Sequence, residues 1–340
     1  MPIEYELRAG ALVWIKNPFT GAISYIVDLR DKSFAFTLGA HSLSPPPPSQ
    51  SDRERMARAL AVCPFCPGNE SKAPSEIIRV PPGEIPHWPG DPACPWTIRV
   101  FNNLFPRIPA ELTGGQNESY VVVEDSRHFL PDARGPSELL FTGAIGEQQF
   151  VRLMEVNAQV VERSLSNPAV QSVVVRKNQG PESGASQPHI HQQIIGSPVN
   201  LPVLEVELRL LRSEPRLWDD LIGLMDQLGL TIDSGPEVVS YASPIGIFPR
   251  SYDVVMPHHR GLLHQLDPAG LSAFARAMHR ILRFIGPIPL DYEIHQAAGM
   301  PLHAHINVRR FPYSNVAGTL NLPQGIFDSV GALRRTLNQD

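Results

Sequence analysis

The sequence is poor in cysteine and contains no long uninterrupted apolar segment. Its 340 residues include 3 cysteines, which cannot all pair with one another, and this excludes a disulfide-rich extracellular domain. No segment approaches the roughly 20 apolar residues that a membrane-spanning helix needs. The first 20 residues contain early acidic residues and no apolar core, so a secretory signal is not expected. We therefore expect a cytoplasmic protein without a membrane-inserted segment.

The sequence also lacks an excess of positive charge. It has 29 basic and 34 acidic residues, which gives a formal net charge of -5. Nonspecific electrostatic binding to nucleic acid is therefore not expected, and any anionic ligand must be bound by a local site. Hydrophobic residues make up 42% of the chain, a share that is ordinary for a protein with a folded core.

Two parts of the sequence repeat the same order of predicted elements. In each part a valine-rich strand and an amphipathic helix precede a segment with histidines at alternate positions. The first unit covers residues 119–125, 147–165, 171–178 and 189–193, and the second covers 251–257, 267–284 and 302–308. This repetition indicates an internal duplication, with domains over residues 1–199 and 200–340.

The two predicted helices differ in detail. Asn157 interrupts the apolar stripe of the first helix. In the second helix Asp267 is a favourable N-cap, and Pro268 occupies the first helical position, where proline is well tolerated.

Small residues precede the first pair of histidines. If residues 189–193 form a strand, His189, His191 and Gln193 lie on one face, although a solvated strand face is the alternative. The N–H groups of the glycine- and serine-rich loop at 180–186 could bind an anion, although many such loops are simple turns. The combination of loop and histidine pair indicates phosphate chemistry.

The segment 176–195 resembles the active-site strand of the galactose-1-phosphate uridylyltransferase family, the transferase branch of the histidine-triad superfamily. The likeness extends to residues 63–70, 98–108, 121–128 and 295–308. It implies an α+β fold of tandem histidine-triad-like half domains, each an antiparallel sheet packed with helices. It also implies a homodimer.

The resemblance gives roles to the residues of this segment. His191 matches the nucleophile that attacks the α-phosphorus of a nucleotide sugar and becomes nucleotidylated. Gln193 matches an amide that hydrogen-bonds the phosphate; it cannot act as a general acid, which favours transfer over hydrolysis. Ser186 and Asn178 match phosphate-contacting positions, and Gly184 lets the backbone pass beside them. An ordinary turn residue is the alternative for Asn178.

The resemblance also implies the substrates. Asn102 and Asn103 match positions that contact the nucleoside, and Arg30 and Arg107 are candidates for phosphate contacts, with solvated arginines as the alternative. The implied reaction moves UMP between a UDP-sugar and a sugar 1-phosphate through a uridylyl-histidine, as in galactose metabolism.

Other activities of the same chemistry stay open. The segment 314–327 lacks the glutamate and tyrosine with which galactose-specific members hold the hexose. One alternative is an adenylyltransferase or phosphorylase that acts on ADP-glucose or a dinucleoside polyphosphate. The other is a nucleotide-binding protein without catalytic activity.

Cys63 and Cys66 have the two-residue spacing of zinc knuckles. A redox pair is the alternative, but no thioredoxin-like strand and helix surround it. The resemblance supplies His128 and His189 as further ligands, which would complete a closed, structural zinc site.

A second metal site is implied by Glu207, His295, His303 and His305. His303 and His305 alternate on a predicted strand, and a carboxylate with imidazoles suits iron or a second zinc ion. Glu205 could replace Glu207 as the carboxylate, and a histidine cluster that is buried in the core or solvated is the alternative.

Overall fold

The computed structural model describes residues 3–26, 49–109, 113–246, 248, 250–309, 315–316, 320–321, 330–331 and 333–335. Arg30 and most of the segment 314–327 lie outside the described residues. Among the described residues, no helix is both long and apolar enough to cross a bilayer.

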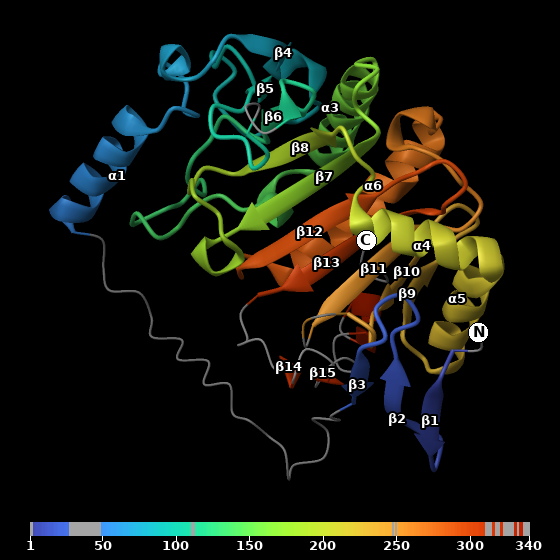
Figure 1. Cartoon of the computed structure of the whole chain (residues 1–340). Coiled ribbons are helices and arrows are strands. Elements are labelled where there is room, and N and C mark those ends of the chain that lie inside the picture. The colour runs from blue at the N-terminus through green and yellow to red at the C-terminus, as the bar shows by residue number, and fades with distance from the viewer. Residues whose placement is uncertain are drawn as a thin grey trace.

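A 10-stranded antiparallel sheet forms the centre of the protein (Figure 1). Its spatial order is β4-β5-β6-β8-β7-β12-β13-β11-β10-β9. From one edge to the other the strands are β4 (Glu76–Val80), β5 (Ile98–Asn102), β6 (Glu118–Val123), β8 (His191–Ser197), β7 (Ser172–Gln179), β12 (Leu290–His295), β13 (Leu302–Val308), β11 (Ser251–Met256), β10 (Val239–Ala242) and β9 (Thr231–Ser234).

The order of strands mirrors itself about the β7–β12 pair. The first half contributes β4 to β8 and the second half β9 to β13, and the histidine-bearing strands β8 and β13 occupy equivalent places. Antiparallel pairing, with Ile294 opposite Val175, joins the two halves edge to edge. The α+β fold of two antiparallel half sheets is thus observed, while the domain boundary at residues 199 and 200 stays a prediction.

Two long helices cover one face of this sheet. α3 (Glu147–Leu165) packs against α6 (Pro268–Ile285), and both contact the strands beneath them. The row of side chains that faces them is apolar and runs across five strands through Ile194, Val175, Ile294, Ala304 and Val254. Both helices match the predicted ranges, because their apolar stripes have a buried face to cover.

The opposite face is covered differently in the two halves. In the second half α4 (Pro202–Ser213) and α5 (Leu217–Gln227) lie over β13, and the Trp218 ring centroid is 4.4 Å from that of His303. In the first half α1 (Gln50–Val62) is set off from the sheet and ends at Cys63, its C-cap residue. The first half therefore keeps more of this face accessible.

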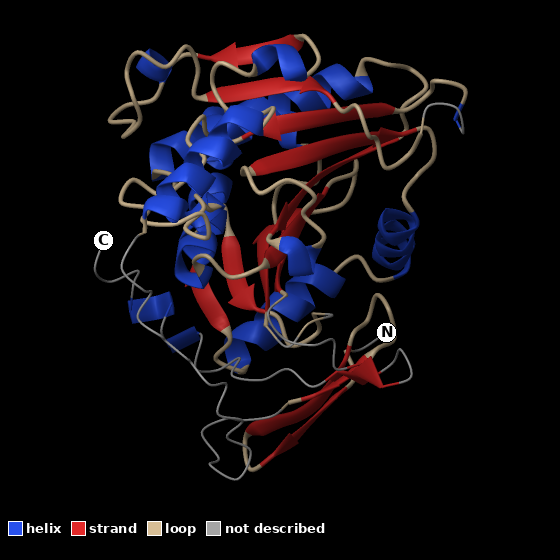
Figure 2. Cartoon of the chain, turned by 90° about the vertical axis from the view of Figure 1, so that its left-hand side faces the viewer, coloured by secondary structure: helices blue, strands red, loops and turns tan. Residues whose placement is uncertain are grey.

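A small 5-stranded sheet lies at one end of the large one (Figures 1 and 2). Its order is β1 (Tyr5–Arg8), β2 (Ala11–Lys16), β3 (Ile23–Tyr25), β15 (Leu320–Asn321) and β14 (Asn315–Val316). It pairs segments from near both ends of the chain, since β15 runs parallel to β3. Single 3-10 turns lie at η2 (Glu70–Lys72), η3 (Pro82–Glu84), η4 (Thr142–Ala144), η5 (Pro181–Ser183) and η6 (Leu263–Gln265).

The predicted strand over residues 189–193 begins later than expected. β8 starts at His191, which is opposite Val123, the last residue of β6. The register would place His189 opposite Asp125, but β6 has ended there. The Asp125 carbonyl instead accepts a hydrogen bond from the His189 ring. His189 therefore lies before the strand, and its side chain does not have to share a face with that of His191.

Candidate active site and metal centres

One ring nitrogen of His191 is held by a buried hydrogen bond. Its Nδ1 lies 2.9 Å from the His189 carbonyl oxygen. A carbonyl can only accept, so Nδ1 carries the proton and Nε2 keeps its lone pair. Burial, followed by the positive charge of Lys177, lowers the pKa of His191 to about 4. The ring is therefore neutral near pH 7 and has a nucleophilic nitrogen.

Two cavities of different character meet at His191. Both are lined by Phe105, Ser186, His191 and Gln193. The first cavity adds the charged or polar residues Arg107, Arg176 and Asn178 and the small residue Gly184. The second has mainly apolar walls, formed by Pro64, Phe65, Pro74, Phe101 and Val121 together with Asn103 and Lys72. An apolar, aromatic cavity beside a charged one suits a ligand with a base at one end and phosphates at the other.

The structure gathers most of the site residues that the sequence predicted. Asn103 lines the apolar cavity, whereas Asn102 is exposed at the end of β5 and lines neither cavity. Arg107 is exposed and lines the charged cavity. Arg30 lies outside the described residues. The roles of all these residues stay predictions.

The small-residue loop wraps back onto Asn178. Gly184 has a φ of 84°, a left-handed conformation that favours glycine, and it ends the turn η5. The Asn178 side-chain amide donates a hydrogen bond to the Ser183 carbonyl. Asn178 itself lies within β7 and not in a turn, so its side chain is fixed at the mouth of the loop. On the neighbouring strand the Gln193 Oε1 atom is buried and has no hydrogen-bond partner among the described residues.

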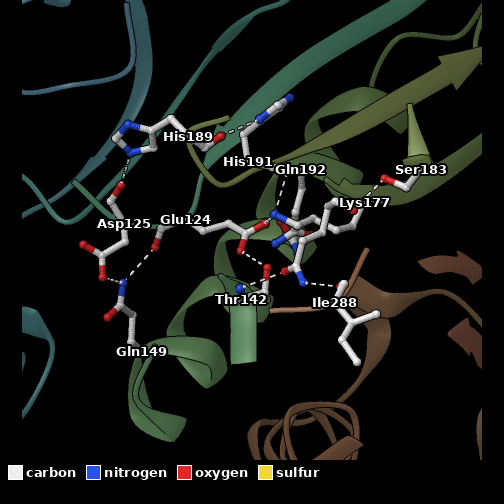
Figure 3. A network of polar contacts seen from close by, with 12 residues as sticks. Glu124, Asp125, Thr142, Gln149, Lys177, Ser183, His189, His191, Gln192 and Ile288 are labelled. Carbon is white, nitrogen blue, oxygen red and sulfur yellow. Dashed lines mark hydrogen bonds and ion pairs between the residues drawn. The ribbon is translucent and has the colours of Figure 1, made fainter. Parts of the chain in front are cut away.

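A buried ion pair lies behind His191, on the helix side of the sheet (Figure 3). Lys177 Nζ donates to Glu124 Oε1 at 2.6 Å and to the His191 carbonyl at 3.1 Å. The Thr142 hydroxyl donates to the other Glu124 oxygen at 2.7 Å. Burial lowers the pKa of Lys177, and Glu124 opposes this shift. The pair thus fixes the backbone of His191 and places a positive charge behind its ring.

The same network holds the backbone next to His189. Gln149 on α3 donates from its side-chain amide to the Glu124 carbonyl and to Asp125 Oδ2, both at 2.8 Å. The Asp125 carbonyl accepts from His189 Nε2 at 2.7 Å (Figure 3). The helix therefore anchors the strand end whose Asp125 carbonyl orients the His189 ring, and the His189 carbonyl in turn holds the His191 ring.

Sequence reasoning missed this network and also Arg176. Lys177 follows Val173 and Val175 at alternate positions of a strand, so it lies on the apolar face, and that placement signals a buried, paired charge. Arg176 precedes Asn178 by two residues, and the same alternation places both on the face of the cavities.

The first candidate metal centre joins residues that are far apart in the sequence. The ligand atoms of Cys63, Cys66, His128 and His189 lie within 4.8 Å of one another, and all four residues are buried. His189 Nδ1 is 3.6 Å from Cys63 Sγ and 3.4 Å from Cys66 Sγ, and His128 Nδ1 is 3.2 Å from Cys66 Sγ. Tetrahedral zinc with bonds of 2.3 Å to sulfur and 2.0–2.1 Å to nitrogen would place such atoms about 3.6 Å apart. The donors therefore fit around one ion.

The second candidate metal centre lies under α4. Glu207 Oε1 is 3.0 Å from His295 Nδ1, and Glu207 Oε2 is 3.5 Å from His303 Nε2. All ligand atoms of Glu207, His295, His303 and His305 lie within 4.8 Å of one another. Burial opposes ionisation of Glu207, but the adjacent imidazoles of His303 and His295 hold its pKa well below the ordinary value. Glu205 is exposed, so Glu207 is the carboxylate of this cluster.

Hydrogen bonds outside this cluster orient two of its rings. His303 Nδ1 donates to the Pro301 carbonyl at 2.8 Å, which leaves Nε2 free to act as a ligand. His305 Nδ1 donates to Asp253 Oδ1 at 2.6 Å. Carboxylate and carbonyl partners of this kind fix the tautomer of metal-binding histidines. The cluster thus has the outer contacts of a metal site, and these contacts disfavour the alternative of a merely solvated histidine cluster.

Comparison with known proteins gives relatives by sequence and by structure. No family model matches the chain. ADP-glucose phosphorylase from Arabidopsis thaliana is 23% identical over 253 residues, which are 68% of this chain and 66% of the relative. The matched part therefore spans just under two thirds of that relative's length.

Solved structures match nearly the whole chain. The crystal structure of an ADP-glucose phosphorylase from Arabidopsis thaliana with bound ADP-glucose aligns with a TM-score of 0.66 and 19% identity, covering 94% of this chain and 97% of that one. A structure of uridylyltransferase aligns with a TM-score of 0.60 and 18% identity, covering 95% and 98%. These likenesses confirm the predicted fold and agree with the resemblance to the galactose-1-phosphate uridylyltransferase family.

Proposed function

We propose that this chain, which has the fold shared by uridylyltransferase and ADP-glucose phosphorylase, is a nucleotidyltransferase that forms a covalent nucleotidyl-histidine at His191. One observation carries the proposal: the His191 ring donates from Nδ1 to the His189 carbonyl and lies where an apolar and a charged cavity meet. A nucleophile needs a lone pair that faces the substrate, and this arrangement leaves Nε2 for that role.

The proposed reaction has two displacements. In the first, His191 Nε2 attacks the α-phosphorus, and the bond from phosphorus to the bridging oxygen breaks, so that a sugar phosphate leaves with the electron pair. In the second, an acceptor attacks the same phosphorus and His191 is released. A phosphate leaving group needs no proton, which is consistent with an amide at Gln193, since an amide hydrogen-bonds but does not protonate.

ADP-glucose is the first donor to test. One relative by sequence is an ADP-glucose phosphorylase, and a solved structure of similar fold has ADP-glucose bound. UMP transfer from a UDP-sugar is the second candidate, supported by the likeness to uridylyltransferase. Galactose as the sugar and a homodimer stay predictions from the resemblance, and a cytoplasmic location stays a prediction from the composition of the sequence.

The two metal centres suit different ions. Two thiolates and two imidazoles favour zinc, so Cys63, Cys66, His128 and His189 would hold a structural zinc ion that ties the end of α1 to the strand of the nucleophile. Glu207 with three imidazoles would hold iron or a second zinc ion. We assign neither ion a step in the transfer.

Intact-protein mass spectrometry tests the proposal. The natural chain and His191→Gly would each be incubated with ADP-glucose, UDP-glucose and UDP-galactose. We expect an AMP adduct from ADP-glucose on the natural chain and no adduct on the variant. A UMP adduct instead would assign the second candidate. The absence of an adduct with every donor, with retained nucleotide binding, would favour the non-catalytic alternative.

A further inference from the structure

We infer that Arg176, together with Arg107, forms a binding site for a phosphate dianion beside His191, and that the acceptor phosphate of the second displacement occupies it. This inference rests on the proposed function and names the residues that bind the acceptor. It concerns the charged cavity, which the two arginines share with His191, Gln193 and Asn178.

The strand register places Arg176 on the correct face. On β7 its cross-strand partner on β8 is Gln193, and the two residues lie on the same face of the sheet. Arg176 Nη2 donates to Asn178 Oδ1 at 3.1 Å, while the Asn178 amide donates to the loop at Ser183. The guanidinium is therefore directed along the row that contains the candidate phosphate-binding residues.

The charge of Arg176 is incompletely compensated within the described residues. Its Nε atom is buried without a hydrogen-bond partner there, and the nearest carboxylate oxygen, of Glu293, is 3.9 Å away. The other oxygen of Glu293 is 3.7 Å from His295 Nε2, so this carboxylate is shared. Arg107 brings a second positive charge to the same cavity. Asp291 also attracts Arg176 but is paired with Arg309 at 2.9 Å. Two guanidinium groups in one cavity, with the nearby described carboxylates distant or already paired, favour an anionic ligand.

A phosphate dianion in this cavity completes the transfer without proton movement. One of its oxygens forms a bond to the α-phosphorus while the bond from phosphorus to His191 Nε2 breaks and its electron pair returns to the ring. Inorganic phosphate would give a nucleoside diphosphate, and a sugar 1-phosphate would give a nucleotide sugar. Water carries no net charge for the two arginines to attract. The cavity therefore favours phosphate over water as the acceptor.

Turnover of the isolated covalent adduct tests this site. Adduct prepared with the natural chain, Arg176→Gln or Arg176→Lys would be chased with buffer alone, with inorganic phosphate or with glucose 1-phosphate. We expect Arg176→Gln to lower the phosphate-dependent rate constant about 10- to 100-fold, as for the loss of a hydrogen bond to a charged group, and to lower hydrolysis much less. Arg176→Lys keeps the charge and should recover part of the loss. Whichever phosphate accelerates turnover identifies the acceptor.

Arg280→Gln is the matched control, because Arg280 lies on α6 and pairs with one carboxylate, Asp233, away from both cavities. It should leave the phosphate-dependent rate unchanged. An equal phosphate-dependent rate in Arg176→Gln and the natural chain would overturn the inference.

Calorimetric titration of inorganic phosphate into the unlabelled proteins separates this inference from the proposed function. If no donor labels His191 but phosphate binds the natural chain and Arg176→Gln binds it at least 10-fold more weakly, the proposed function fails and the anion site stands. Equal binding to both proteins would overturn the anion site, whether or not an adduct forms.

Discussion

The two halves of the large sheet carry histidines on equivalent strands but give them different partners. On β8, His191 has its Nδ1 bonded to a carbonyl and its ring at the meeting point of two cavities. On β13, His303 has its Nδ1 bonded to a carbonyl in the same way, but its Nε2 faces Glu207 at 3.5 Å. In both halves the hydrogen bond at Nδ1 thus leaves Nε2 available. This nitrogen belongs to a residue that lines an open cavity in one half and to a closed cluster in the other.

The different surroundings of the two histidines follow from the elements that cover β8 and β13. α4 brings the Glu207 carboxylate over β13, and α5 places the Trp218 ring against His303. Over β8 lies the small-residue loop, whose Gly184 and Ser186 line a cavity. In two halves of mirrored strand order, a cavity therefore lies beside the histidine strand that a loop covers, and a closed cluster lies over the histidine strand that helices cover.

The largest effect should come from removing the histidine on each strand. His191→Gly removes the only nitrogen we assign to the covalent step, so transfer should fall by about 10⁴-fold or more. His303→Gly should still form the adduct and should lose metal from the second centre. Assays of the transfer rate, intact-protein mass spectrometry and metal analysis on both variants test this. Labelling that disappears in His303→Gly and persists in His191→Gly would reverse the roles of the two halves.

The first metal centre should contribute more to folding than the second. Cys66→Ser should lose bound zinc and more than about 3 kcal/mol of unfolding free energy, because structural zinc contributes roughly 10 kcal/mol or more in small domains. Metal analysis and urea unfolding measure both. Cys94→Ser is the control, since Cys94 is half-buried and donates only to the Trp96 carbonyl. Unchanged zinc content in Cys66→Ser would contradict the assignment.

Buried and exposed ion pairs in the two halves should differ in the same assay. Lys177→Met leaves Glu124 buried and unpaired, which should cost about 3–5 kcal/mol, and Lys177→Met with Glu124→Gln should recover much of it. Arg280→Met breaks a partly exposed pair with Asp233 and should cost less than about 1 kcal/mol. If both single variants have the same unfolding midpoint, burial does not set the strength of the first pair.

Elements with a regular pattern could be predicted from the sequence. The apolar stripes gave α3 and α6 closely, and alternation gave β13 over its full range. Asn157, which interrupts the stripe of α3, donates to Gln192 at 3.0 Å within the core, so the interruption marks a buried polar pair. Such local patterns reflect which side of an element is buried, and that information is present in the sequence.

Features that depend on which strands meet could not be predicted. The two halves are joined by the pairing of β7 with β12. Either strand could instead have been the edge of a separate sheet, and no residue type specifies their pairing. Glu124 and Lys177 are 53 residues apart in the sequence, so their pairing follows from the register of β6, β8 and β7. The spacing of Cys63 and Cys66 indicated two ligands of the first candidate metal centre, but their distant partners, such as His189, came only from the resemblance.

The smallest expected effect compares the starts of the two long helices. α6 begins with Asp267, whose Oδ1 accepts from the Gly270 N–H at 2.7 Å, whereas Gly146 at the start of α3 offers no side-chain cap. Asp267→Ala should cost about 1 kcal/mol in urea unfolding. Gly146→Asp should gain a few tenths of a kcal/mol, because its φ of -64° suits any residue and an added Cβ meets nothing within 4 Å. If Asp267→Ala costs nothing, Pro268 and the packing of the apolar stripe suffice to start α6, and the same would then hold for α3, which already begins without a side-chain cap.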